Sequence, residues 1–368
     1  MTDISPLPYV REIAPYQAGK PIDELAREYG LDPKSIVKLA SNENPRGMPD
    51  SARHAITNAM TDLGRYPDSN GFDLKSALSA RFKVPTDWIT LGNGSNDILE
   101  LAAAALLSPG RSCVYAQHAF AVYALATQAR GARAIVVPAK DLGHDLDAVA
   151  SAIGSDTTLV YIANPNNPTG THLPADAVTR FLTRVPPQVV VVIDEAYNEY
   201  LPPDRRFDSV RWVRDYPNLL ISRTFSKAYG LAGLRVGYGV AQPALTDVLN
   251  RVRQPFNVNA VAQAAALAAL QDDAFLDQSY QLNAAGMKRM IDAFIELRLD
   301  FVPSYGNFVL VMVGDAGRVY EELLKRGVIV RPVANYGLPE WLRITIGLPE
   351  ENERFVQALA ESLEAVAA

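Results

Sequence analysis

Cysteine is almost absent from this chain, since its 368 residues include only Cys113. A lone cysteine excludes an intrachain disulfide and argues against a metal cluster held by thiolates. Histidine is also scarce: the four histidines are scattered and form no metal-binding pattern such as His-Glu-x-x-His. We therefore expect no metal centre, and we interpret Cys113 and the histidines as structural or surface residues.

The sequence also lacks the marks of proteins that bind nucleic acid, leave the cell or cross a membrane. The net charge is −6, and no run is rich in lysine or arginine. The N-terminus shows no basic segment followed by an apolar one, so we expect no signal peptide. The apolar run Val189–Ile193 has the length of a strand, far short of a membrane span. A cytoplasmic enzyme is the class that remains.

Short apolar runs rich in β-branched residues recur about every thirty residues in the middle of the chain. They are Leu159–Ala163, Val189–Ile193 and Leu219–Ser222, and a helical pattern separates the first two at Ala175–Arg184. Strand, helix, strand at this spacing is the βαβ unit, and uninterrupted apolar strands indicate a sheet covered on both faces. We predict an α/β fold with a mostly parallel sheet covered by helices.

Two further strands and a helix are expected before these runs. The strands are Trp88–Leu91 and Ser112–Tyr115, and the helix spans residues 96–107 with Ser95 or Asn96 as its cap.

The pattern changes after about residue 255. An alanine-rich helix at Ala260–Leu270 and a long helix to Arg298 precede alternating short strands and helices, which is typical of a smaller α+β domain. The first forty-five residues, rich in Pro, Tyr and Gly, have the character of an arm. The predicted division is an arm with a substrate-site segment at 1–45, a large cofactor-binding domain at 46–255 and a small domain at 256–368.

Lys227 is the most informative single residue. It follows the apolar strand at 219–222 and is flanked by hydroxyl and small residues rather than by charges. Burial disfavours the charged form of lysine, so a lysine in this place becomes a nucleophile. The chemistry that uses such an amine most often is Schiff-base formation with a carbonyl or with pyridoxal phosphate.

Polar residues follow the carboxyl ends of the predicted strands, where ligands bind in open α/β sheets. The segments are Asn164–Gly170 (NPNNPTG), Asp194–Tyr197 (DEAY) and Ser222–Gly237, which contains Lys227. Another strand leads into Gly92–Asp97 (GNGSND), a glycine-bearing turn at a helix start. Free N–H groups and the helix dipole make such a turn a phosphate site.

Over essentially its whole length the chain resembles the fold type I pyridoxal phosphate-dependent aminotransferases, which have the aspartate aminotransferase-like fold. Within them it is most similar to the histidinol-phosphate aminotransferases. The runs that carry this second similarity are 15–21 (PYQAGKP), 39–45 (LASNENP), 65–67 (RYP) and 341–347 (WLRITIG). The resemblance implies ping-pong transamination between L-histidinol phosphate and 2-oxoglutarate, giving imidazole acetol phosphate and L-glutamate, in histidine biosynthesis.

The resemblance also implies roles around pyridoxal 5′-phosphate. Lys227 would form the Schiff base and move the substrate proton, and Asp194 would keep the ring nitrogen protonated. Tyr197 and Asn167 would contact the ring hydroxyl, and Phe120 would stack on the ring. The phosphate would be held by Ser95, Asn96, Thr224, Ser226 and Arg235. Tyr66 would reach the cofactor phosphate of a partner subunit, which implies a homodimer.

For the substrate, the resemblance implies Arg343 as the anchor, because an arginine fork can hold either a carboxylate or a phosphate. Arg331, Tyr16 and Asn44 are the further substrate candidates. The two arginines could instead form ordinary ion pairs, Tyr16 could simply pack in the arm, and Phe120 could be a core residue.

Two other functions stay open, and a third is considered. An aromatic amino-acid aminotransferase would need an apolar pocket in place of the phosphate donors. A lyase of the threonine-phosphate decarboxylase kind would release carbon dioxide without a keto acid. A non-enzymatic pyridoxal-binding regulator lacks support, because no DNA-binding extension flanks the domain.

Overall fold

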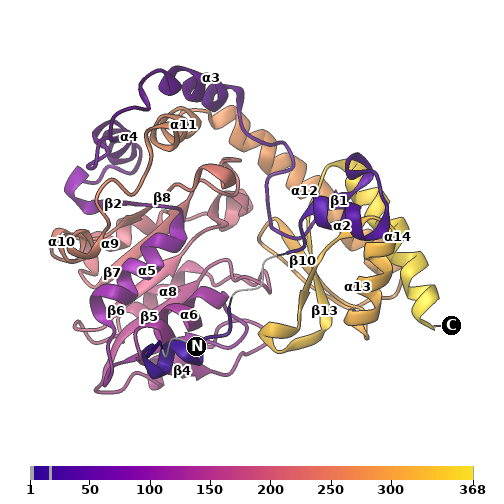
Figure 1. Ribbon diagram of the computed structural model, residues 1–368. Helices are drawn as coiled ribbons and strands as arrows, with labels where there is room; N and C mark the ends of the chain where they lie inside the picture. Colours follow the sequence, from indigo (N-terminus) through magenta and orange to yellow (C-terminus); the bar gives the residue numbers. More distant parts are fainter. Residues whose placement is uncertain (1–3, 16–18, 368) are drawn as a thin grey trace.

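The computed structural model describes residues 4–15 and 19–367 and places them in a larger and a smaller part joined by the long helix α12 (Figure 1). The larger part is built on a seven-stranded sheet in the order β2-β8-β7-β6-β5-β3-β4. Strands β3 to β7 are parallel, while β8 runs antiparallel to both of its neighbours. The predicted α/β class is confirmed. The strands are β2 (Ile89–Gly92), β3 (Ser112–Ala116), β4 (Arg133–Val137), β5 (Thr157–Ala163), β6 (Val190–Asp194), β7 (Leu219–Thr224) and β8 (Gly237–Val240).

Alternate residues of each strand enter two separate cores, one on each face of the sheet. On β6, Val191 and Ile193 face one core, and Val190 and Val192 face the other. Burial on both faces explains why the strand runs are apolar without alternation. The first core contains α3 (Asp50–Ala59), α4 (Phe72–Phe82), α7 (Leu146–Ser151), α8 (Ala175–Leu182), α9 (Trp212–Asp215) and α11 (Ala260–Leu270). The second contains α5 (Ser95–Leu106), α6 (Ala121–Ala129) and α10 (Pro243–Val252).

The smaller part is a four-stranded antiparallel sheet in the order β12-β13-β10-β9, covered by α12, α13 and α14. Met290 of α12, Leu323 of α13 and Phe355 of α14 are fully buried in its core. The elements are α12 (Asp273–Glu296), β9 (Phe301–Val302), β10 (Phe308–Met312), α13 (Ala316–Lys325), β12 (Arg331–Val333), β13 (Leu338–Thr345) and α14 (Pro349–Ala367).

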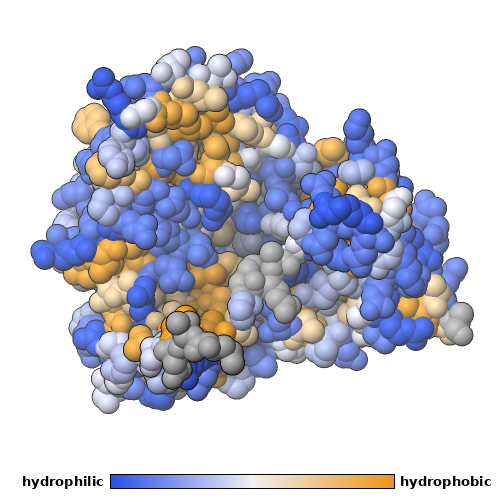
Figure 2. Space-filling model, in the orientation of Figure 1, coloured by the Kyte–Doolittle hydropathy of each residue, from blue (hydrophilic) through white to orange (hydrophobic). Residues whose placement is uncertain are grey.

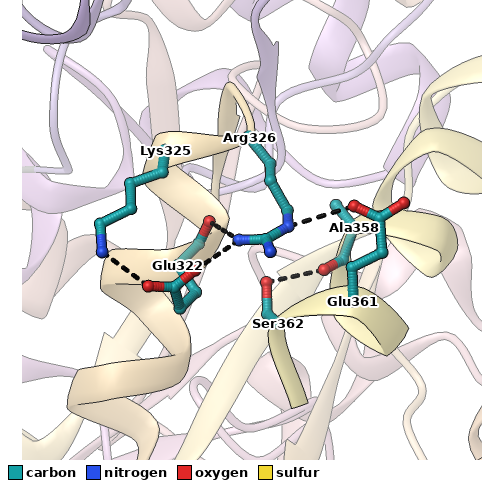
Figure 3. Close-up of polar contacts among 6 residues, drawn as sticks. All are labelled: Glu322, Lys325, Arg326, Ala358, Glu361 and Ser362. Carbon is teal, nitrogen blue, oxygen red and sulfur yellow. Dashed lines mark hydrogen bonds and ion pairs between the residues drawn. The ribbon is translucent and has the colours of Figure 1, made fainter. Parts of the chain in front are cut away.

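Ion pairs join α13 to α14 on the surface of the smaller part (Figure 3). Arg326 lies between Glu322, at 2.6 Å, and Glu361, at 3.2 Å. Lys325 makes a second contact with Glu322 at 2.6 Å. Exposed pairs of this kind contribute about 0–1 kcal/mol each, so the apolar interface holds the two helices together.

Part of the predicted arm belongs to a core. The described N-terminal elements are α1 (Pro8–Arg11), α2 (Ile22–Tyr29) and β1 (Val37–Lys38), and β1 pairs in parallel with β11 (Val328–Ile329) of the smaller part. Leu25 is fully buried beside Ile329. The prediction that the first forty-five residues stay outside a core is therefore wrong for residues 22–40, whose apolar face packs on the smaller part. The division of the chain at residues 45 and 255 stays a prediction.

Two local predictions differ from the structure in their details. The strands expected at 159–163, 189–193 and 219–222 are β5, β6 and β7, with ends that differ by one or two residues. The helix expected at 96–107 begins at Ser95, and its N-cap is Gly94, which has no side chain to cap with. The expected cap by Ser95 or Asn96 is wrong, because both residues already lie inside the helix.

In the part of the chain that the structure describes, no helix is long and apolar enough to cross a membrane. Within the same residues, no three His, Cys, Asp or Glu side chains come together as metal ligands.

Candidate active site

A cavity of about 320 Å³ lies where the carboxyl ends of β5, β6 and β7 meet the start of α5 and the sheet of the smaller part. Figure 2 shows the hollow between the two parts on the face in view. The structure brings most of the predicted site residues to this cavity: Ser95, Asn96, Phe120, Asn167, Asp194, Tyr197, Thr224, Ser226, Lys227, Arg235, Arg331 and Arg343.

Lys227 is partly buried three residues after the end of β7. Its Nζ donates a hydrogen bond to the carbonyl oxygen of Ser41, 3.0 Å away. Burial, reinforced by the positive charge of Arg343, lowers the pKa of Lys227 to about 8. A substantial fraction of the amine is therefore neutral and nucleophilic near physiological pH.

Asp194 is the last residue of β6 and is 5 % exposed. Its Oδ2 accepts a hydrogen bond from the hydroxyl of Tyr123 at 3.0 Å. Its Oδ1 is buried and accepts no hydrogen bond from any residue that the structure describes. Burial raises the pKa of Asp194 to about 6, against the opposing effect of the Tyr123 hydroxyl. The carboxylate thus presents one unsatisfied oxygen at the cavity, a place for a cationic donor.

Tyr197 and Asn167 are held by residues that come from distant parts of the chain. Asn42 donates to the Tyr197 hydroxyl at 2.9 Å, and Arg343 donates to Oδ1 of Asn167 at 2.7 Å. Burial raises the pKa of Tyr197 to about 12, so its phenol keeps its proton and can donate it into the cavity.

An anion site is built where α5 begins. Gly94 has φ +80°, and a Cβ there would lie 2.7 Å from Nη2 of Arg235. Arg235 itself has φ +56° and donates through Nη1 to Ser226 Oγ at 3.2 Å. The guanidinium is therefore close to the first free N–H groups of α5. A guanidinium, hydroxyl groups and a helix N-terminus together suit a phosphate group.

Two arginines lie next to each other on neighbouring strands of the smaller part. Arg331 on β12 and Arg343 on β13 are directly paired in the antiparallel ladder, and both line the cavity. They are 8 % and 6 % exposed. Two neighbouring guanidinium groups can together offer several hydrogen-bond donors to one anion.

Two predicted site residues, Tyr66 and Asn44, do not line this cavity. Tyr66 is 82 % exposed and stacks on Phe256 with ring centroids 4.6 Å apart. Asn44 is buried elsewhere, with its amide donating to the Ala228 carbonyl and to Ser279 Oγ, both at 2.9 Å. Tyr16 lies outside the described residues.

Some residues at the site were not predicted from the sequence. Ser41 and Asn42 line the cavity, and Tyr123 contacts Asp194 from behind it. Ser41 and Asn42 belong to the run at 39–45, in which the sequence predicts Asn44 as the substrate residue. Nothing in the local sequence of Tyr123 distinguishes it from a core residue, because its role depends on the packing of α6 over β6.

Comparison with known proteins agrees with this geometry. Residues 34–359 match the family model described as aminotransferase class I and II. The chain belongs to this family. It is 68 % identical over 360 residues to the histidinol-phosphate aminotransferase 1 of Cupriavidus pinatubonensis, an alignment that covers 97 % of this aminotransferase and 96 % of the relative.

Solved structures are similar to this aminotransferase over most of its length. The histidinol-phosphate aminotransferase from Sinorhizobium meliloti, in complex with pyridoxal-5′-phosphate, matches with a TM-score of 0.90 and 29 % identity, covering 100 % of this chain and 99 % of that one. The L-threonine-O-3-phosphate decarboxylase from Porphyromonas gingivalis matches with a TM-score of 0.79 and 25 % identity, covering 89 % and 100 %. A transaminase and a lyase thus share this architecture.

Proposed function

We propose that this aminotransferase uses pyridoxal 5′-phosphate to interconvert L-histidinol phosphate and 2-oxoglutarate with imidazole acetol phosphate and L-glutamate. The observation that carries the proposal is the buried pair Arg331 and Arg343, which faces the same cavity as Lys227 and Asp194. The names of its relatives support the same substrate. The reaction is a step of histidine biosynthesis.

The described side chains fit pyridoxal phosphate. The unsatisfied Oδ1 of Asp194 suits a protonated ring nitrogen, and the start of α5 with Thr224, Ser226 and Arg235 suits the phosphate group. When bound, this cofactor supplies a carbonyl carbon that an amine can attack and a ring that withdraws electrons from the substrate. Phe120 at the cavity wall would cover one face of that ring.

Lys227 would supply the amine and then carry the proton between the substrate carbon and the cofactor carbon. Its lowered pKa suits both tasks, because the amine exchanges its proton readily near pH 8. Asp194 would hold the proton on the ring nitrogen. Tyr197 would donate from its phenol, and Asn167 from its amide, to the ring oxygen.

Arg331 and Arg343 would bind the substrate anions in turn. The phosphate of histidinol phosphate needs more donors than the carboxylate of glutamate, and two neighbouring guanidinium groups provide them. We propose Arg343 for both half-reactions and Arg331 chiefly for the phosphate. Tyr16 and Asn44 remain weaker candidates, and the hydrogen bonds of Asn44 favour a structural role.

A homodimer belongs to the same proposal. Figure 2 shows apolar atoms around α11. Large apolar side chains are also exposed on the segment that runs from α3 to the start of α4 and at Phe256, which stacks on Tyr66 of that segment. These side chains are Met60, Leu63, Tyr66, Phe72 and Phe256. An apolar patch of this kind marks a protein interface. There Tyr66 would reach the cofactor phosphate of the partner. A cytoplasmic location and the absence of membrane or nucleic-acid partners complete the proposal.

The test is a side-by-side assay of the purified enzyme with histidinol phosphate, phenylalanine and threonine phosphate, each with and without 2-oxoglutarate. We expect turnover of histidinol phosphate that depends strictly on the keto acid. Faster turnover of phenylalanine would instead favour an aromatic aminotransferase. Carbon dioxide from threonine phosphate without the keto acid would favour the lyase.

Arg331→Gln tests the substrate assignment. We expect KM for histidinol phosphate to rise by about 10- to 100-fold, since a charge-assisted hydrogen bond contributes about 1.5–3 kcal/mol, and KM for glutamate to rise less. Arg318→Gln, on the exposed side of α13, is the control and should leave both values unchanged. Equal effects on the two substrates would contradict a role for Arg331 in binding the phosphate.

A further inference from the structure

Tyr123 touches the carboxylate of Asp194 from the side away from the cavity. It is the third residue of α6 and is fully buried, and its hydroxyl donates to Oδ2 of Asp194 at 3.0 Å. The other oxygen, Oδ1, has no donor among the described residues. The two oxygens therefore differ: the protein itself holds one of them and leaves the other for a ligand.

Three aromatic contacts hold the ring of Tyr123 in place, one of them with Tyr115 at 6.4 Å between centroids. The Tyr123 ring stacks on Tyr161 of β5, with centroids 4.6 Å apart and planes within 5°, and it meets Phe120 edge-on at 6.0 Å. The hydroxyl of Tyr161 is bound to a different group, the carbonyl of Leu99, at 2.8 Å. A ring fixed by a strand on one side and a neighbouring residue on the other cannot swing away from Asp194.

The hydrogen bond also acts on the charge of Asp194. Burial disfavours the carboxylate, and the phenol is a donor that favours it. Burial raises the pKa of Tyr123 far above its ordinary value, so this phenol stays a donor over the whole working range of pH. The other titratable groups around Asp194 are Lys227 and Tyr197 at the cavity, Tyr161 behind Tyr123, and Glu195, which pairs with Arg223 on the opposite face of the sheet.

We propose that Tyr123 is a positioning residue for the reaction: it holds Oδ2 of Asp194, which keeps the carboxylate ionised and aims Oδ1 at the ring nitrogen of the cofactor. The proposal rests on the assignment of pyridoxal phosphate made above, though not on the identity of the amino-acid substrate. Phe120 then has a second role in addition to covering the cofactor ring. It packs against Tyr123, which orients Asp194.

Tyr123→Phe and Tyr161→Phe form a matched pair for the test. Each removes one buried phenolic oxygen and keeps the stacked rings, but only Tyr123→Phe removes a contact with Asp194. In the holoenzyme we expect Tyr123→Phe to lower kcat about tenfold, with KM for histidinol phosphate within about twofold, and to raise the dissociation constant of pyridoxal phosphate several-fold. Tyr161→Phe should change none of these more than about twofold.

A second measurement uses the apoprotein and needs no substrate. Because the pKa of Asp194 is raised above its unfolded value, the native state binds more protons between about pH 4 and 6, and stability falls as pH rises through that window. Without the phenol the pKa of Asp194 rises further. The Tm deficit of Tyr123→Phe should therefore be larger at pH 8 than at pH 5, whereas that of Tyr161→Phe should not change with pH.

Equal behaviour of the two variants in cofactor affinity and in the pH dependence of Tm would overturn the proposal, as would a Tyr123→Phe enzyme with unchanged kcat. If the cofactor and Tm results hold while histidinol phosphate is not turned over, the substrate assignment fails and the positioning role stands.

Discussion

Burial of the Lys227 amine makes the residue reactive and also lowers the stability of the folded apoprotein. Its native pKa of about 8 lies below the unfolded value, so the unfolded state binds the extra proton between about pH 8 and 10.5. Stability therefore rises with pH through this window, and below pH 8 the full penalty of burying the charge applies. The amine is buried for its chemistry and not for the fold.

Lys227→Met is thus predicted to abolish turnover and yet to stabilise the apoprotein. At pH 7 we expect a gain of about 1–3 kcal/mol in the free energy of unfolding, fading as pH approaches 10.5. Urea denaturation at pH 7 and 10, together with a transaminase assay, measures both effects. Lys34→Met, at an exposed lysine, is the control and should show neither effect. Retained turnover would show that Lys227 is not the reactive amine.

Among the secondary-structure elements, the antiparallel strand β8 determines how closely the backbone can pack against the start of α5 at the anion site. It enters the sheet at Gly237, where an added Cβ would lie 2.4 Å from the N atom of Ser95 and 2.8 Å from the carbonyl oxygen of Arg223. Both contacts are to backbone, which cannot move aside as a flexible side chain would. β8 therefore approaches the start of α5 only because residue 237 has no side chain.

Gly237→Ala is accordingly expected to destabilise the protein by about 1–3 kcal/mol and to weaken cofactor binding, because the start of α5 must shift. Thermal denaturation and equilibrium dialysis of pyridoxal phosphate report the two effects. Gly233→Ala is the matched control, since its Cβ would meet nothing within 4 Å. If the two variants bind the cofactor alike, the close approach of β8 has no bearing on the site.

The sequence alone predicts those elements whose burial produces a recognisable run or pattern of apolar residues. Strands β5, β6 and β7 are buried on both faces, so their apolar runs stand out and place Asp194 and Lys227 at strand ends. β1 has only two residues, and its partner β11 lies at the other end of the chain, so no local pattern could pair them.

Contacts between elements could not be predicted from the sequence either, because no local pattern records them. Tyr123 reads as an apolar residue of α6, and only the packing of that helix over the sheet brings its hydroxyl to Asp194. Asn42 has φ +54° and donates to Tyr197, 155 positions further along the chain. A motif can identify a residue that acts on a ligand, but not the residues that hold it in place.

Considered as an assembly, the proposed dimer makes each site depend on two chains. Tyr66 is too exposed to act on the cavity of its own subunit, whereas Lys227 and Arg343 line it directly. Residues supplied by one chain and residues supplied by its partner can therefore be separated by mixing variants.

A mixture of Lys227→Ala and Tyr66→Ala is predicted to be more active than either variant alone. After subunit exchange about a quarter of the sites would carry Lys227 from one chain and Tyr66 from the other. Activity before and after mixing, with sedimentation to verify the dimer, measures this. Lys227→Ala mixed with Arg343→Ala is the control and should gain nothing, because both residues serve their own cavity. The absence of any gain in the first mixture would remove Tyr66 from the partner's site.

The parallel pairing of β1 with β11 sets an order of events during synthesis. Val37 meets Val328 only after about 290 further residues have been made. At about 5–20 residues per second, the ribosome needs roughly 15–60 seconds for that stretch. Through that time Leu25 and the residues packed around it lack their later partners Leu324 and Ile329, while the seven-stranded sheet can already form. The segment that carries Ser41 and Asn42 to the cavity is thus among the first to be made and among the last to be folded.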